Sequence, residues 1–248
     1  MNQVLLITGA SRGIGAATAL RAARAGWDIA VNFTRDAAAA EAVAAQVREL
    51  GRRALVVQAD VAVEAEVHSM FAAVDAGLGP LSGLVNNAGI IDRAQRVDEM
   101  DAARLTRMLA VNVVGTMLCA GAALRRMSTR HGGRGGVIVN LSSAAARLGA
   151  AGQYVDYAAA KGAIDTFTLG LAREVATEGV RVNAVRPGII DTEIHASGGQ
   201  PDRVRQMTPL VPMQRAGSAD EVAAAIVWLL GDDAGYTTGS VLDVTGGR

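Results

Sequence analysis

Short apolar runs rich in Val, Ile and Leu alternate with longer, Ala-rich stretches along the whole chain. The apolar runs predict strands at 4–8, 29–33, 54–58, 83–86, 137–141, 181–185 and 240–244. The longer stretches predict helices near 14–25, 36–50, 64–77, 99–130, 156–178 and 219–230. Strands that alternate with helices form βαβ crossovers, and strands without polar alternation are buried on both faces. The pattern therefore predicts one α/β domain over 1–248, with a doubly wound parallel sheet of seven strands and helices on both faces.

One segment departs from this regular alternation. Residues 187, 201, 209 and 212 are four of the five prolines, and Ser197, Gly198 and Gly199 lie in the same stretch. Proline and glycine interrupt helices and strands, and long irregular connections inside compact domains are usually functional. We expect residues 186–217 to form a mobile substrate flap over a binding site.

Charge and cysteine content narrow the possible functions. The 24 basic and 24 acidic residues give no net charge, so the chain lacks the positive field of a nucleic-acid-binding protein. Its one cysteine, Cys119, excludes a disulfide framework, and His68, His131 and His195 lack the spacing of a metal site. The chain begins with an apolar strand rather than a charged leader, and no apolar run reaches the ~20 residues that span a bilayer. We expect a soluble, cytoplasmic protein without metal, nucleic-acid or membrane partners.

Lysine occurs only once, at Lys161, although 24 residues are lysine or arginine. Lys161 lies four residues after Tyr157 in a stretch that predicts a helix, so the two side chains share one helix face. A free tyrosine titrates near pH ~10, and a neighbouring ammonium favours the phenolate and so lowers the pKa of the phenol. A pair at this spacing also arises by chance, but we interpret Tyr157 and Lys161 as the start of a proton-transfer site.

A glycine-rich turn links the first predicted strand to the first predicted helix. Residues 8–15 read Thr-Gly-Ala-Ser-Arg-Gly-Ile-Gly, with glycines at 9, 13 and 15. Glycine lets the backbone approach a pyrophosphate closely, and the helix N-terminus offers free N–H groups and a positive dipole end. The turn predicts a nucleotide site and a sheet of the Rossmann type, with a spacing that differs from the common G-x-G-x-x-G.

Ordered motifs along the full chain resemble those of the short-chain dehydrogenase/reductase family, in its single-domain form. They are a glycine signature after the first strand, an acidic residue after the third, an N-N-A-G stretch after the fourth, a helix asparagine, a serine after the fifth strand, a Y-x-x-x-K pair, and a P-G with a following threonine after the sixth. In that order the matches are Thr8, Gly9, Gly13 and Gly15; Asp60 and Val61; Asn86, Asn87, Ala88 and Gly89; Asn112; Ser143, or less closely Ser142; Tyr157 and Lys161; Pro187, Gly188 and Thr192.

The resemblance implies an oxidoreductase that transfers hydride between a nicotinamide cofactor and a carbonyl or secondary alcohol. It implies that Tyr157 is the acid/base and that Ser143 holds the substrate oxygen. It also implies that Lys161 binds the nicotinamide ribose and that Asn112 positions a water between Lys161 and solvent. Asn112 has a structural alternative, a hydrogen bond to neighbouring backbone, and Thr192 has one as a helix cap. The implied cofactor-binding residues are Gly9, Ser11, Arg12, Gly13, Ile14, Gly15, Phe33, Arg35, Asp60, Val61, Asn87, Ala88, Gly89, Tyr157, Lys161, Pro187, Gly188, Ile190 and Thr192.

The end of the second predicted strand bears on the choice of cofactor. NAD-preferring relatives usually have an acidic residue there, whereas residues 31–35 read Val-Asn-Phe-Thr-Arg. Arg12 and Arg35 are placed to flank a 2′-phosphate, which favours NADP(H). NAD(H) stays an alternative, because both arginines also suit solvated positions and Asp36 lies nearby.

The sequence leaves the substrate open. We expect a small-molecule carbonyl or alcohol in a site lined by Ser143, Tyr154, Tyr157 and His195. Relatives reduce 3-oxoacyl groups on an acyl carrier protein or act as sugar and polyol 1-dehydrogenases. A non-catalytic NADP(H)-binding regulator is a remote alternative, since such proteins commonly lose the tyrosine or the lysine and this chain keeps both.

An arginine-rich segment and two long helices are candidate surfaces for binding other protein chains. The arginine run over 125–134 suits either a solvated helix end or a docking patch for an acidic carrier protein, and Glu178 mildly disfavours docking. The helices predicted at 99–130 and 156–178 are long and rich in small apolar residues. In relatives these helices form the main interface of a tetramer, so we expect a homotetramer.

Overall fold

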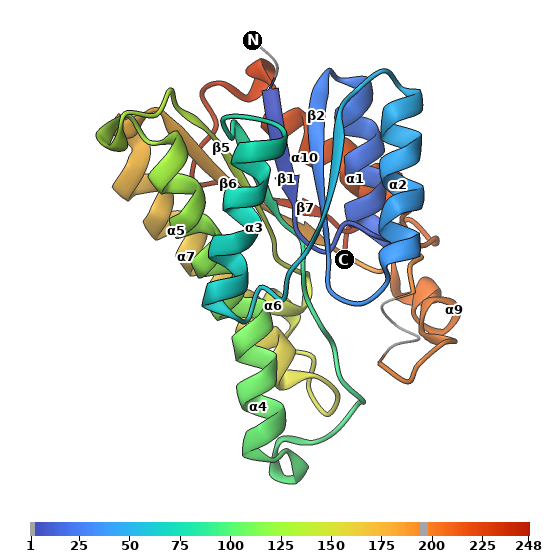
Figure 1. The fold of residues 1–248 in the computed structure, drawn as a ribbon. Helices are drawn as coiled ribbons and strands as arrows, with labels where there is room; N and C mark the ends of the chain where they lie inside the picture. The colour runs from blue at the N-terminus through green and yellow to red at the C-terminus, as the bar shows by residue number, and fades with distance from the viewer. Residues whose placement is uncertain (1–2, 194–197) are drawn as a thin grey trace.

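The computed structural model describes residues 3–193 and 198–248, which form one sheet with helices on both faces (Figure 1). All the strands are parallel, in the order β3-β2-β1-β4-β5-β6-β7. Their bounds are β1 (Gln3–Ile7), β2 (Trp27–Phe33), β3 (Ala54–Gln58), β4 (Gly83–Asn86), β5 (Gly136–Leu141), β6 (Val180–Pro187) and β7 (Val241–Val244). The doubly wound, seven-stranded α/β fold that the sequence predicts is confirmed.

Residues of a single strand divide between the two hydrophobic layers. Leu5 and Ile7 of β1 pack with one group of helices, whereas Val4 and Leu6 pack with the other. The first layer contains α1 (Gly13–Arg24), α2 (Ala37–Glu49) and α10 (Ala219–Leu230). The second contains α3 (Glu64–Gly77), α5 (Gly115–Met127) and α7 (Val155–Val175). This two-sided burial explains why the central strands carry continuous apolar runs.

The helix predicted at 99–130 is less regular than its pattern suggests. The segment begins with α4 (Ala102–Leu109), passes through a π-helical turn (Ala110–Val114), and continues into α5. Asp101 sets the start, because its carboxylate accepts a hydrogen bond from the main-chain N–H of Arg104 at 2.8 Å. Ser128 ends the helix with extended backbone, before a short 3-10 turn at Thr129–His131. The predicted ends at 99 and 130 are therefore wrong by three residues each.

By length and composition, the helical segment Ala102–Met127 could cross a membrane. However, Cys119, Ala122 and Ala123 are buried in the second hydrophobic layer, and the core helix of a water-soluble domain passes the same test. The segment is therefore weak evidence for a membrane span.

The order in which successive strands join the sheet reverses at β1, which has β2 on one side and β4 on the other. In open α/β sheets, ligands bind beyond the carboxyl ends of the strands at this switch point. The shorter helices α4, α6 (Ala145–Leu148) and α9 (Arg203–Met207) all lie beyond that edge (Figure 1). The two short helices α6 and α9 were not expected from the sequence, because each has too few residues to show a helical period.

The segment expected to be a flap, 186–217, closes back on the sheet. Ile190 and Gly217 form a parallel bridge, and the N–H of Asp191 donates to the carbonyl oxygen of Gly217 at 2.9 Å. The described part of the loop between them carries α9 and a 3-10 turn at Thr208–Leu210. Its two ends are thus held together over the carboxyl edge of the sheet.

Candidate active site

A cavity of about 460 Å³ opens beyond the carboxyl ends of the central strands. Its wall combines the start of α1, the loop after β4, the end of β5, the first turns of α7 and the segment after β6. The predicted site residues that line it are Ile14, Asn87, Gly89, Ser143, Tyr154, Tyr157, Lys161, Pro187, Gly188, Ile190 and Thr192. Residues from most of the predicted motifs therefore meet in one space.

Lys161 is almost fully buried at the base of this cavity, with 4% of its surface exposed. Its ammonium nitrogen Nζ donates to the carbonyl oxygen of Leu141, the last residue of β5, at 2.7 Å. The same nitrogen lies 5.6 Å from the centre of the Tyr157 ring. Helix α7 thus presents the ammonium and the phenol to the cavity on one face, as their spacing predicts.

The pKa values of the pair differ from the sequence-based expectation. Burial raises the pKa of Tyr157, and a hydrogen bond with Ser143 opposes that rise only in part. Burial also lowers the pKa of Lys161 to about 8, although the negative charge of Asp165 acts to raise it. We expected Lys161 to help lower the pKa of Tyr157, whereas in this structure desolvation of the phenolate raises that pKa. Tyr157 is therefore held protonated at neutral pH.

The two adjacent serines after β5 have different roles in the structure. Ser142 is buried, and its hydroxyl donates to the main-chain carbonyl oxygen of Lys161 at 3.2 Å. Ser143 is hydrogen-bonded to Tyr157, and its Oγ also accepts the N–H of Ala145 at 3.1 Å. Ser142 thus ties β5 to α7, whereas the Ser143 hydroxyl lies beside the phenol.

Asn112 lies in the π-helical turn and is fully buried. Its Oδ1 accepts the N–H of Ile90 at 3.1 Å, and its Nδ2 donates to the carbonyl oxygens of Ile90 (3.0 Å) and Met108 (3.1 Å). A Cβ added to Gly89 would lie 2.8 Å from Asn112 Oδ1 and 3.6 Å from Lys161 Nζ. The side chain therefore fixes the loop after β4 close to Lys161, which is the structural role considered as its alternative.

The glycine turn is packed tightly against the loop after β4. Gly9 and Gly13 have φ of 62° and 57°, and a Cβ on Gly15 would lie 2.6 Å from both the Gly9 carbonyl oxygen and Asn87 Nδ2. Asn87 Nδ2 donates to the carbonyl oxygens of Thr8 (2.8 Å) and Gly9 (2.9 Å). Only glycine suits these positions without a shift of the backbone.

This turn fits the pyrophosphate of a dinucleotide. The first turn of α1 carries no acidic residue, and its N-cap residue Arg12 makes no side-chain capping bond. The positive end of the helix dipole therefore faces the cavity uncompensated, beside a backbone that glycines keep narrow. Among residues 3–193 and 198–248, no group of three or more His, Cys, Asp or Glu side chains is placed to hold a metal ion.

The other predicted cofactor residues surround this turn at different depths. Arg12 and Arg35 are exposed and Ser11 is half-buried, whereas Phe33 and Val61 are buried in the hydrophobic layers. Asp60 accepts the N–H of Ala62 at 2.9 Å, and the N–H of Ala88 donates to Thr8 Oγ1 at 3.0 Å. The side chains of Phe33 and Val61 are thus turned into the core, away from solvent.

Of the remaining predicted substrate residues, one lines the cavity and one lies outside the described part of the chain. Tyr154 is buried, with 2% of its surface exposed, and lines the cavity at the start of α7. His195 lies outside the described residues. Arg203 of α9 and Arg248 also line the cavity, and no local pattern predicts either, because only the fold brings these distant segments to α7.

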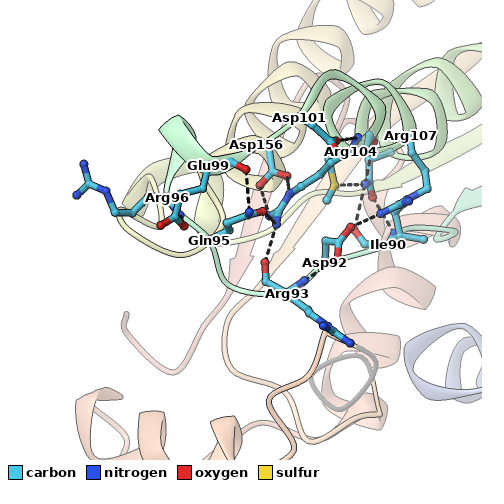
Figure 2. A network of polar contacts seen from close by, with 12 residues as sticks. Ile90, Asp92, Arg93, Gln95, Arg96, Glu99, Asp101, Arg104, Arg107 and Asp156 are labelled. Carbon is cyan, nitrogen blue, oxygen red and sulfur yellow. Dashed lines mark hydrogen bonds and ion pairs between the residues drawn. The ribbon is translucent and has the colours of Figure 1, made fainter.

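A buried ion pair braces the start of α7, and sequence reasoning missed it. Arg104 donates to both carboxylate oxygens of Asp156, at 2.8 and 3.2 Å, and the two side chains are 8% and 2% exposed. Figure 2 shows Arg104 between Asp156 and the loop of Arg93 and Gln95, whose oxygens accept from its Nη1 at 2.7 and 2.8 Å. Asp156 directly precedes Tyr157, so this network fixes the backbone that carries the phenol.

Comparison with known proteins gives consistent matches over nearly the full length. A family model described as enoyl-(acyl carrier protein) reductase matches residues 9–248. The uncharacterized oxidoreductase YgfF of Escherichia coli K12 is 53% identical over 245 residues, which cover 99% of each chain. A 3-oxoacyl-(acyl-carrier-protein) reductase of Synechocystis is 38% identical, over 99% of this chain and 96% of that protein. A short-chain dehydrogenase/reductase of Serratia marcescens, solved as a double mutant, superposes with a TM-score of 0.91 at 35% identity, over 99% of this chain and 97% of that one.

Removing one partner of the Arg104–Asp156 pair should strongly destabilise the protein. An unpaired buried charge costs about 3–5 kcal/mol, so Asp156→Asn or Arg104→Met should lower the melting temperature by roughly 6–20 °C. Arg107→Met is the matched control, because Arg107 lies on the same helix and pairs with Asp92 at the surface, where a pair contributes about 1 kcal/mol or less. Thermal unfolding at one protein concentration measures the difference; equal shifts in both helix variants would contradict it.

Proposed function

The chain belongs to the short-chain dehydrogenase/reductase family, and on that premise we propose that it is an NADP(H)-dependent oxidoreductase that interconverts a carbonyl compound and a secondary alcohol. One observation carries the proposal: Ser143, Tyr157 and Lys161 converge in a cavity that adjoins the glycine turn. A phenol, a hydroxyl and an ammonium in one enclosed space supply a proton donor and the groups that hold and polarise a carbonyl oxygen.

The protein residues divide the proton chemistry among them. A bound nicotinamide supplies or accepts the hydride and, when oxidised, adds a positive charge. Ser143 donates a hydrogen bond to the substrate oxygen, and Tyr157 protonates that oxygen in reduction or accepts its proton in oxidation. Because burial keeps the phenol protonated, the free protein is suited to act as the acid. Lys161, with its pKa near 8, keeps most of its charge at neutral pH and favours the phenolate once the proton has left.

A route for the proton beyond Tyr157 is the remaining part of the mechanism. Asn112 was expected to position a water, but most of its amide capacity is used by Ile90 and Met108. An amide oxygen accepts two hydrogen bonds, and the structure shows one at Asn112 Oδ1. We propose that a water held at this second acceptor position connects Lys161 with solvent.

The preference for NADP(H) is supported by the charges around the glycine turn. Arg12 pairs with Glu193 at 3.6 Å, but both side chains are more than 60% exposed (63% and 72%), so the pair is weak and a phosphate can displace it. Arg35 is exposed just after β2. Asp36, which follows Arg35 in the sequence, accepts the N–H of Ala39 at 2.9 Å as the cap of α2. A 2′-phosphate would thus meet two arginines, while the carboxylate of Asp36 is already engaged in capping α2.

A second candidate function is the reduction of 3-oxoacyl groups on an acyl carrier protein. The description of the matching family model and the Synechocystis relative favour it. Glu178 disfavours it, because its carboxylate adds a negative charge to the arginine run that would dock an acidic carrier protein. This carboxylate accepts the hydroxyl of Ser128 at 2.5 Å and lies 4.0 Å from Arg130. A small-molecule substrate is therefore the better-supported proposal.

We further propose a homotetramer built on the long helical segment and α7. Leu109, Val114 and Met117 of the segment Ala102–Met127 and Leu169 of α7 are each 39–46% exposed despite their large apolar side chains. Exposed apolar side chains of this size on two long helices suit a contact with another chain. Leu242 on β7 and Trp228 on α10 are exposed near the far edge of the sheet and suit a second contact.

Replacement of Tyr157 by phenylalanine should remove turnover without unfolding the protein. Loss of a general acid costs about a hundredfold to ten-thousandfold in kcat. The rate is read at the nicotinamide absorbance with a panel of carbonyls and alcohols, and stabilisation by NADPH on heating checks cofactor binding. Tyr236→Phe, at a fully exposed tyrosine, is the control. Substantial residual activity in Tyr157→Phe would rule out the proton-donor role, and a wild-type chain inactive toward the whole panel would favour the regulator.

Neutralising either arginine beside the glycine turn should selectively weaken NADPH binding. Charge-assisted hydrogen bonds contribute about 1.5–3 kcal/mol, so Arg12→Ala and Arg35→Ala should each raise the Kd for NADPH about tenfold or more. The Kd for NADH should change less than about threefold. Arg24→Ala, at the opposite end of α1, should change neither. Tenfold better efficiency of the wild type with NADH would refute the preference.

Light scattering at micromolar concentration should give four times the chain mass of 25.4 kDa. A charge at the centre of the proposed interface, Val114→Glu combined with Met117→Glu, should lower that mass. Leu50→Glu should not, because Leu50 is similarly exposed (39%) but follows α2 on the other face of the sheet. A wild-type monomer would contradict the assembly.

A further inference from the structure

Arg203 lies in the cavity wall opposite the start of α7. Its guanidinium carbon is 4.9 Å from the centre of the Tyr154 ring, and its Nη1 donates to Gln153 Oε1 and Gln200 Oε1, both at 2.8 Å. The stacked ring and the two amide oxygens hold the guanidinium in one plane and one position.

One edge of this guanidinium has no partner among the residues that the structure describes. Both of its hydrogen bonds come from Nη1, and within 3–193 and 198–248 the Nε and Nη2 atoms have no acceptor. These atoms form the parallel pair of donors that binds the two oxygens of a carboxylate. A fixed fork with open donors is a preorganised site for a planar anion.

The cavity has an excess of positive charge around this fork. Lys161, Arg203 and Arg248 line it, and none of the described lining residues is aspartate or glutamate. Arg248 is half-buried. Its burial lowers the pKa of its guanidinium, and the positive charge of Arg203 lowers that pKa further. An anion between the two arginines would relieve this repulsion.

We propose that the substrate is a small oxo acid, or the corresponding hydroxy acid, whose carboxylate is bound by Arg203 with Arg248 adding charge. The proposal deepens the proposed function and rests on it. Tyr154, which stacks on Arg203 just before α7 begins, lines the same cavity as Tyr157. A carboxylate held by Arg203 and an oxygen held beside Tyr157 therefore lie in the same cavity, and hydride is exchanged at the carbon that bears that oxygen.

Arg203 has a structural alternative, since its bonds to Gln153 and the ring contact also join the flap to α7. A purely structural role would affect all substrates alike. Recognition of an anion affects only substrates that carry the charge, and it acts mainly on KM. The two roles are therefore separable with matched substrates.

The test compares pyruvate, acetoacetate and levulinate with their ethyl esters, using NADPH, in wild type, Arg203→Met and Arg203→Lys. The wild type should prefer at least one acid over its ester by about tenfold or more. Arg203→Met should lower kcat/KM for that acid about tenfold to a hundredfold, through KM, and for the ester less than about threefold. Arg203→Lys should recover part of the loss, because it restores the charge without the fork.

Arg205→Met is the matched control, because Arg205 lies two residues along the same helix, is 80% exposed and pairs with Asp202. It should leave every ratio unchanged. Esters that equal or exceed the acids in the wild type, or equal losses for acid and ester in Arg203→Met, would overturn the proposal.

A binding measurement separates this inference from the proposed function. In the presence of NADPH the preferred acid should raise the melting temperature of the wild type but not of Arg203→Met. If the wild type turns over neither these compounds nor any member of the panel of carbonyls and alcohols, the proposed function fails, and this thermal shift alone decides whether the anion site exists. Absence of any acid-dependent shift in the wild type would then refute it.

Discussion

The buried ammonium of Lys161 is the constraint around which the rest of the site is built. A desolvated cation needs an acceptor, and the carbonyl oxygen of Leu141 at the end of β5 provides one at 2.7 Å. That bond requires α7 to run alongside the carboxyl edge of the sheet, where Ser142 holds the main chain of Lys161 and the Arg104–Asp156 pair braces the first turn. With α7 held there, Tyr157 and Ser143 face the same cavity.

The same burial sets the electrostatics of the reaction. It raises the pKa of Tyr157 and lowers that of Lys161 to about 8, so each group is held nearer its neutral form than in water. The pH at which the phenol ionises in the working enzyme therefore depends on charges added to the cavity, of which an oxidised nicotinamide brings a positive one. An anionic substrate held by Arg203 is placed where positive charge already exceeds negative, so its binding is favoured without an added cation.

The periodic features were predictable from the sequence, and the long-range ones were not. Strands such as 54–58 and helices such as 64–77 follow from local apolar spacing and agree with the structure residue for residue. The Tyr157–Lys161 pair and the glycine turn are likewise local patterns. The π-helical turn at Asn112 depends on amide bonds to Ile90, the Arg104–Asp156 pair joins residues 52 apart, and Arg203 reaches Tyr154 only through the folded flap. The rise in the pKa of Tyr157 in the free protein was not predictable for the same reason, because the depth of its burial is set by tertiary packing.

Titration of Tyr157 itself tests the electrostatic account most directly. The chain has only three tyrosines, so the ultraviolet signal of tyrosinate in wild type minus Tyr157→Phe reports this one phenol. The account predicts that its pKa lies above the usual value of about 10 in the free protein and falls well below it with oxidised cofactor bound. It also predicts that most of this fall is lost in Lys161→Met. A pKa of Tyr157 that does not move when the oxidised cofactor binds would contradict the account.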